Sequence, residues 1–168
     1  QIVSDELYLS DYFIFDNPNI SSIQHIDCLA KLVNSETIII KQVSESSPEY
    51  ECIEDFAESF YDLNTFYGRP FKIYRVYCPE ITGGWWEINP VAAYTNSLIL
   101  NGKVLVPQYG ILADANALNI YQEAMPGYEV IGFLNDTGSP WYGEDALHCR
   151  TIGIFDSNMI HLSHKSIR

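Results

Sequence analysis

The sequence is short of positive charge and of long apolar runs. Its 168 residues contain 9 Lys and Arg against 22 Asp and Glu, which gives a net charge of −13. Because an acidic chain repels phosphate backbones and anionic lipids, we expect neither nucleic acid nor a membrane as a partner. No apolar run approaches the ~20 residues of a membrane-spanning helix. The charge is compatible with a cationic ligand, although many acidic proteins are acidic only because this keeps them soluble.

The common metal-binding and phosphate-binding motifs are also absent. The four cysteines include no Cys-x-x-Cys pair, and the four histidines form no His-Glu-x-x-His motif. Zinc and iron–sulfur sites are therefore not expected. The sequence has no Gly-x-Gly-x-x-Gly run and no Walker loop, so a nucleotide site is not expected either. We predict no metal and no cofactor.

The chain does not begin with Met and carries no targeting segment. We therefore expect a processed or truncated amino terminus. Separately from this observation, we predict a secreted or cell-surface protein. The length is that of one domain, and 47% of the residues are hydrophobic. This is enough apolar material for a substantial core.

Hydrophobic periodicity indicates a repeated strand–strand–helix–strand unit. In the first unit we expect strands at 27–33, 37–43 and 71–77, with a helix from Ser47-Pro48 to about residue 66. In the second we expect strands at 94–100, 103–107 and 128–133, a hairpin turn at Asn101-Gly102, and a helix at 113–125. A third unit begins near residue 146 and continues to about residue 155.

Such ββαβ repeats predict an α/β fold in which each unit buries its faces against its neighbours, as in a propeller. The repeat units cover about 25–78, 94–133 and the residues from 146 onward. Two and a half units do not close a ring. We therefore expect a second chain or a precursor segment to supply the missing units.

Polar or nucleophilic residues stand at the start of each unit, namely Asp27, Asn96 and Cys149. In a radial repeat these positions converge near one end of the axis, where a shared site can form. Cys149 follows a loop and lies between His148 and Arg150, whose positive charge would favour a reactive thiolate. Each residue alone also has a structural interpretation: Cys149 could be a core thiol, and Asn96 could bond a turn.

The other cysteines lie in apolar or helical patterns typical of buried thiols. These are Cys28, Cys52 and Cys78. His25, close to Asp27, could simply form a loop hydrogen bond with it. Cys149, His25 and Asp27 together nevertheless form a candidate catalytic set.

Five strings around these positions carry a resemblance to a known family. They are His25-Ile26-Asp27-Cys28, Thr95-Asn96-Ser97-Leu98-Ile99-Leu100-Asn101, Ala117-Leu118-Asn119-Ile120-Tyr121, Ala124-Met125-Pro126-Gly127-Tyr128-Glu129 and Asp145-Ala146-Leu147-His148-Cys149-Arg150-Thr151. The sequence resembles the Porphyromonas type of bacterial peptidylarginine deiminase between about residues 24 and 154. That family belongs to the guanidine-modifying superfamily, which includes agmatine deiminase.

The resemblance implies a five-bladed α/β propeller that hydrolyses arginine in peptides or proteins to citrulline and ammonia, without a metal. It implies that Cys149 is the nucleophile and His25 the general acid/base. Asp27 would hold the guanidinium group, and Asn96 would be an active-site asparagine.

Nothing before Gln24 matches the blades that carry the rest of this family's pocket. We therefore interpret residues 1–168 as the carboxy-terminal part of a deiminase catalytic domain, with roughly the later half of the propeller. Two alternatives remain open. One is a deiminase of small guanidines such as agmatine, and the other is a non-catalytic fragment or binding module.

Overall fold

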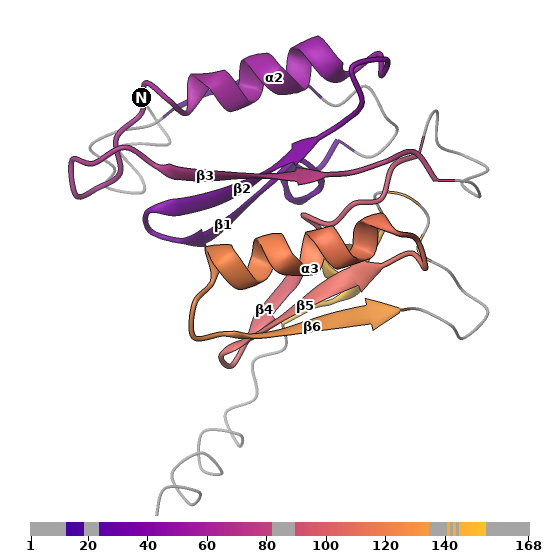
Figure 1. Cartoon of the computed structure of the whole chain (residues 1–168). Coiled ribbons are helices and arrows are strands. Elements are labelled where there is room, and N and C mark those ends of the chain that lie inside the picture. The colour runs from indigo at the N-terminus through magenta and orange to yellow at the C-terminus, as the bar shows by residue number, and fades with distance from the viewer. Residues whose placement is uncertain are drawn as a thin grey trace, which may run out of the picture.

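The computed structural model describes residues 13–18, 24–81, 90–134, 141, 143 and 145–153. Most of these residues belong to two α/β units, each with a three-stranded sheet and one helix (Figure 1). The first contains β1 (Ala30–Asn34), β2 (Thr37–Gln42), α2 (Tyr50–Ser59) and β3 (Lys72–Tyr77). The second contains β4 (Leu98–Leu100), β5 (Lys103–Gln108), α3 (Ala113–Ala124) and β6 (Glu129–Leu134). None of the helices in these ranges is long and apolar enough to cross a membrane.

The two sheets share one topology. In each, the first two strands pair antiparallel, and the third lies parallel to the middle strand after a helical crossover. The turn between β4 and β5 places Asn101 at φ 50° and Gly102 at φ 74°, as a hairpin turn of this type requires. The α/β class and the ββαβ order are thus confirmed. Two sheets alone form no ring, so the five-bladed propeller stays a prediction.

Helix α3 lies between the two sheets (Figure 1). One side contacts β5 and β6 of its own unit, and the other contacts β2 and β3 of the first unit. The Tyr74 hydroxyl of β3 donates to the carbonyl of Glu123 at 3.0 Å, which ties α3 to the neighbouring sheet. The first unit therefore completes its core with the helix of the second unit, as stacked repeats do.

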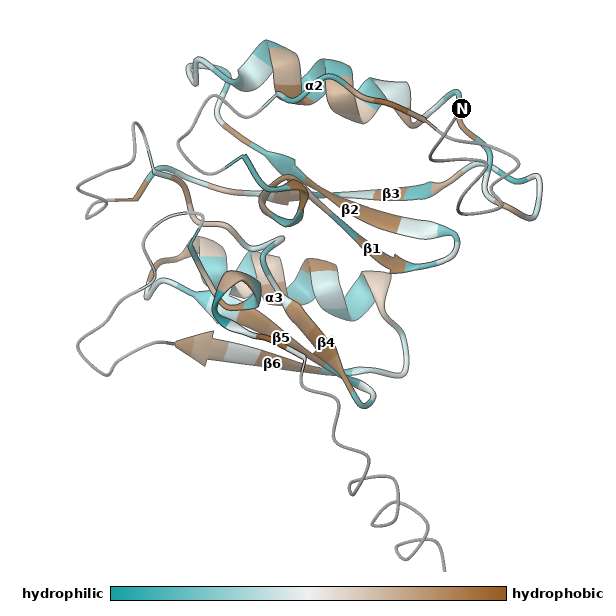
Figure 2. Ribbon diagram, turned by 180° about the vertical axis from the view of Figure 1, so that it is seen from behind, coloured by the Kyte–Doolittle hydropathy of each residue, from teal (hydrophilic) through white to brown (hydrophobic). Residues whose placement is uncertain are grey.

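Strand β2 is the most buried element, and its central part, brown in Figure 2, is apolar because three isoleucines follow one another there. Ile39 and Ile40 have no exposed surface. Burying each such side chain stabilises the fold by roughly 1.5–3 kcal/mol. Lys41, on the same strand, is equally buried, and its ammonium lies 3.0 Å from the Glu49 carboxylate.

The boundaries of two predicted strands were wrong. Residues 27–29 do not belong to the first strand, because Ile26–Cys28 forms a short 3-10 turn, η1, in which the Cys28 amide donates to the carbonyl of His25. The predicted strand at 94–100 contains only β4, because the Asn96 amide closes a turn on Ala93. Both polar side chains thus stand on tight turns before the strands, where local hydrogen bonds compete with the sheet.

The first helix also ends earlier than predicted, at Ser59 instead of about residue 66. Beyond it the chain turns back at Gly68, which has φ 71°, and the Thr65 amide donates to the carbonyl of Arg69. The start of the third unit contains a second 3-10 turn, η2 (His148–Arg150). The rest of this predicted unit, from residue 154 onward, lies outside the described residues.

Candidate active site

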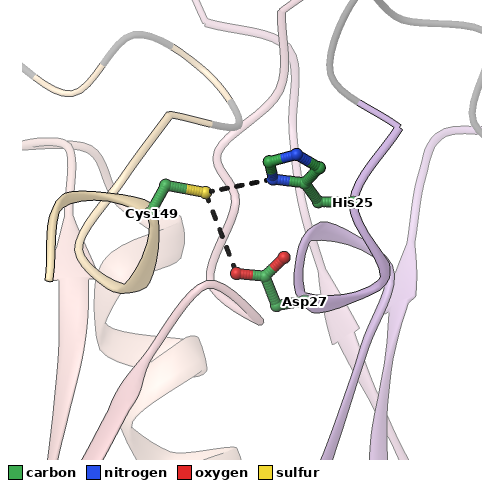
Figure 3. A group of neighbouring side chains, drawn as sticks. All are labelled: His25, Asp27 and Cys149. Atoms are coloured by element: carbon green, nitrogen blue, oxygen red, sulfur yellow. Dashed lines mark hydrogen bonds between the residues drawn. The ribbon is translucent and has the colours of Figure 1, made fainter. Parts of the chain in front are cut away.

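The four predicted site residues come together from three distant segments of the chain. His25 and Asp27 lie at η1, Asn96 lies in the turn before β4, and Cys149 lies in η2. The Cys149 sulfur is 3.7 Å from His25 Nδ1 and 3.8 Å from Asp27 Oδ2 (Figure 3). A thiol, an imidazole and a carboxylate therefore share one small volume between the two units.

Asn96 is the centre of this cluster and is fully buried. Its Oδ1 accepts hydrogen bonds from the backbone amides of His148 at 2.8 Å and Cys149 at 3.2 Å. Its Nδ2 donates to Asp27 Oδ2 at 2.8 Å and to the Cys149 sulfur at 3.1 Å. One amide side chain thus uses both its acceptor and its donors to hold η2 against η1.

The turn that carries Asn96 is itself fixed by helix α3. The buried Tyr121 hydroxyl donates to the carbonyl of Tyr94 at 2.9 Å and lies 2.8 Å from the Ser97 hydroxyl. The Tyr94 hydroxyl donates to Asp114 Oδ1 at 2.7 Å. Burial, followed by the bond to Asp114, raises the pKa of Tyr94 far above its usual value. Tyr94 therefore remains a neutral donor.

Asp114, which accepts the hydrogen bond from Tyr94, lies in the first turn of α3. Its carboxylate also accepts the backbone amides of Tyr109, Gly110 and Ile111 at 2.8–3.2 Å. A carboxylate at a helix amino terminus is favoured by the helix dipole. The position of Asn96 thus depends on a network of buried polar groups on the second unit.

Two side chains that sequence reasoning did not assign to the site contact it. His148 Nδ1 lies 2.6 Å from Asp27 Oδ2, and because an ionised carboxylate only accepts, His148 is the donor. The Lys31 ammonium of β1 donates to the carbonyl of Ser97 at 2.6 Å and so joins the two units. Burial lowers the pKa of Lys31, and the negative charge of Asp27 opposes this. Lys31 lies four residues after Asp27, but nothing in the sequence indicates that it turns toward the site.

The expected activation of Cys149 by neighbouring positive charge was wrong. Burial and the carboxylate of Asp27 raise the pKa of the Cys149 thiol, against the hydrogen bond from Asn96, which lowers it. Arg150 is directed to Asp145, with Nη2 2.9 Å from Oδ2. The sequence places the cation of Arg150 next to Cys149, but Asp145, five residues before Arg150, forms an ion pair with it.

The other cysteines divide by burial. Cys28 and Cys78 are buried, as predicted, but Cys52 is exposed on α2, so the prediction of a buried Cys52 was wrong. Only Ile53, Phe56 and Ala57 of α2 are buried, and Cys52 lies beside this buried face of the helix.

The cluster has the composition of a metal site as well. Potential ligand atoms of His25, Asp27 and Cys149 all lie within 4.8 Å of one another. Thiolate and imidazole are ligands that zinc prefers. The same three groups are equally suited to nucleophilic catalysis without a metal.

A known family matches most of the chain. The profile of the family described as Porphyromonas-type peptidyl-arginine deiminase matches residues 17–154, which include all four site residues. The chain belongs to this family. A protein of Lactococcus lactis named "Putative agmatine deiminase" is 33% identical over 144 residues. A protein of Enterococcus faecalis with the same name is 30% identical over 144 residues.

Solved structures share the fold. A structure described as a "Putative Arginine Deiminase from Porphyromonas gingivalis" aligns with a TM-score of 0.72 at 28% identity, covering 88% of this chain and 44% of that one. The agmatine deiminase of Enterococcus faecalis aligns with a TM-score of 0.62 at 27% identity, covering 74% and 38%. The matches to the Lactococcus and Enterococcus sequences each cover 76% of this chain but only 39% of the relative. The matched part of this chain therefore spans about two fifths of the length of these relatives.

Proposed function

We propose that the chain is the nucleophile-bearing part of a cysteine-dependent deiminase that hydrolyses the guanidinium group of a small guanidine such as agmatine. The observation that carries the proposal is the convergence of Cys149, His25 and Asp27 around the buried Asn96 amide. These segments are far apart in the sequence, so their approach is a property of the fold. A deiminase needs these three groups, and the match to the peptidyl-arginine deiminase family indicates deimination as the class of reaction.

The first step is binding of the cation by Asp27. Among the described residues, the contacts to this carboxylate all use Oδ2, from Asn96, His148 and Cys149. Oδ1 is therefore the oxygen for an N–H donor of the guanidinium. Pairing with a carboxylate holds the planar cation in one orientation.

The second step is attack by Cys149. Its raised pKa makes the thiolate scarce at rest, but a bound guanidinium offsets the negative charge of Asp27 and favours the thiolate. The sulfur adds to the central carbon, and the carbon–nitrogen bond breaks as ammonia leaves with a proton from His25. His25 then takes a proton from water, which adds to the covalent thiouronium. The carbon–sulfur bond breaks and releases the ureido product.

The curated relatives favour a small guanidine, since those of Lactococcus lactis and Enterococcus faecalis are named as agmatine deiminases. Arginine in a peptide or protein is the second candidate, because the family that matches residues 17–154 is described as peptidyl-arginine deiminase. Both substrates would present the same cation to Asp27 and Cys149. They differ in the groups beyond the guanidinium.

We also propose that a second chain or a precursor segment completes a five-bladed propeller around this site. The support is a sheet face on the second unit that Trp141, Ala146 and Leu147 cover only in part. Leu100 of β4 and Phe133 of β6 are 53% and 42% exposed. In the first unit, the strands that correspond to β5 and β6, namely β2 and β3, pack against α3 of the next unit. Another unit stacked on β4–β6 would bury the exposed side chains in the same way.

Product analysis by mass spectrometry tests the proposed activity. The chain alone, and the chain joined to the proposed precursor segment as a longer form, would each be incubated with agmatine and with peptides carrying internal or carboxy-terminal arginine. Cys149→Ala should abolish formation of the ureido product, whereas Cys52→Ala, which removes an exposed thiol far from the site, should leave it unchanged.

Turnover of agmatine alone would support the small-guanidine reaction, and turnover of the peptides alone would replace it with the second candidate. Turnover by the longer form only would support the proposal that other blades complete the site. No turnover by either form would reject the deiminase and leave a binding module.

A further inference from the structure

A second thiol lies beside Cys149 in the same cluster. The sulfur of Cys28 is 3.6 Å from Asn96 Nδ2, and the sulfur of Cys149 is 3.1 Å from the same nitrogen. The Cys28 thiol also hydrogen-bonds the Cys149 sulfur, which lowers the pKa of Cys149 against the effect of burial. The two sulfur atoms hydrogen-bond each other, and both accept a hydrogen bond from the same amide nitrogen. They are therefore direct neighbours.

The two thiols differ in access to solvent. Cys28 has no exposed surface, whereas Cys149 is partly exposed. A small oxidant from solution therefore reaches Cys149 first, and Cys28 is held behind it. Cys28 ends η1 and Cys149 lies in η2, so both stand on short turns outside the sheets.

We propose that Cys28 and Cys149 form a peroxide-sensitive dithiol, in which Cys28 traps oxidised Cys149 as an intramolecular disulfide. The Cys149 thiolate attacks hydrogen peroxide, the oxygen–oxygen bond breaks, and a sulfenic acid forms as hydroxide leaves. The Cys28 sulfur then attacks the Cys149 sulfur, the sulfur–oxygen bond breaks, and water leaves with the Cys28 proton. In total, two thiols are oxidised to one disulfide, and one peroxide is reduced to two water molecules.

The disulfide protects Cys149 from irreversible oxidation. Sulfinic and sulfonic acids of cysteine are not restored by ordinary thiol reductants, whereas a disulfide is. If Cys149 is the nucleophile, the disulfide also switches the enzyme off reversibly; this consequence rests on the proposed function, but the modification itself does not. A test that reads the covalent state of the chain separates the two.

The experiment treats the 168-residue chain with hydrogen peroxide and then blocks the remaining thiols. Digestion and mass spectrometry identify the state of each cysteine. We expect a peptide pair joined through Cys28 and Cys149, in a chain lighter by two hydrogen atoms. Dithiothreitol should return both thiols.

The Cys28→Ser variant should instead accumulate sulfinic or sulfonic acid at Cys149, which dithiothreitol does not reverse. The matched control is Cys78→Ser, which alters the other buried thiol. It should form the same joined peptide pair as the unmodified chain. Peptide mapping of the unmodified chain needs no variant, so the proposal can be tested even if Cys28→Ser does not fold.

Three results would overturn the proposal. The first is oxidation of Cys149 to sulfinic or sulfonic acid while Cys28 remains a free thiol in the unmodified chain. The second is a disulfide that joins only separate chains. The third is full reversal of Cys149 oxidation by dithiothreitol in Cys28→Ser, which would show that Cys28 is not the resolving thiol.

Discussion

The change Asn96→Asp replaces the central donor of the site by a carboxylate of nearly the same shape. Asn96 Oδ1 accepts two backbone amides, and an aspartate oxygen would keep these bonds. Asn96 Nδ2, however, lies 2.8 Å from Asp27 Oδ2. The substitution therefore brings a second negative charge against Asp27 in a buried position.

The loss in free energy of unfolding that we expect for Asn96→Asp follows from Coulomb's law and from proton binding. At 2.8 Å and an effective dielectric constant of about 20, two carboxylates repel each other by about 6 kcal/mol. The folded variant can avoid this by binding one proton. At pH 7 that costs about 4 kcal/mol for a carboxyl group with an ordinary pKa near 3.9. We therefore expect the free energy of unfolding to fall by about 2–4 kcal/mol at pH 7.

The pH dependence identifies the cause. Repulsion raises the pKa of the carboxyl pair in the folded state above its unfolded value, so the folded variant binds one more proton than the unfolded chain. Its stability relative to the unmodified chain should fall by about 1.4 kcal/mol per pH unit above about pH 4. It should approach that of the unmodified chain below about pH 4. Urea unfolding followed by circular dichroism at several pH values measures this slope.

The control is Asn101→Asp, the same change at the exposed turn before β5. It should show no slope between pH 5 and pH 7, since ordinary carboxyl groups are already ionised there. A pH-independent loss in Asn96→Asp, or no loss at all, would refute the contact between Asn96 and Asp27 on which the site depends.

Two further predictions concern the thiol and the buried ion pair. Because burial and Asp27 raise the pKa of Cys149, its alkylation rate should reach half its maximum above about pH 8.5, the value of an ordinary thiol, and saturating agmatine should lower that midpoint. A midpoint below about pH 8.5 in the free chain would contradict the raised pKa. Lys41→Met removes the cation 3.0 Å from buried Glu49 and should cost about 3–5 kcal/mol in urea unfolding at pH 7. Adding Glu49→Gln should recover much of this loss, and strictly additive losses would show that the pair does not interact.

Local sequence predicted the elements well where a pattern repeats along one segment. The β-branched run before Gln42 predicts a buried strand, and Asn101-Gly102 predicts the hairpin turn. Local prediction failed at the ends of elements. Asp27 and Asn96 read as strand residues because apolar side chains follow them, but turn hydrogen bonds keep both out of the sheets.

The candidate site was predictable as a set of residues, because the repeat places Asp27, Asn96 and Cys149 at the same point of successive units. Its electrostatics were not. Sequence places Arg150 beside Cys149, yet Arg150 pairs with Asp145, and the fold brings the carboxylate of Asp27 to the thiol. His148, adjacent to Cys149, was not expected to contact Asp27.

The sequence by itself thus determined the α/β class, the order of elements, the family and the residue types available for chemistry. Periodicity and turn preference act over a few neighbouring residues, so they can be read along the chain. Only the tertiary structure decided that Cys28 lies against Cys149, that Lys31 reaches Ser97, and that the Cys149 pKa rises. Contact and burial depend on distances between segments far apart in the chain, and no local pattern encodes those distances.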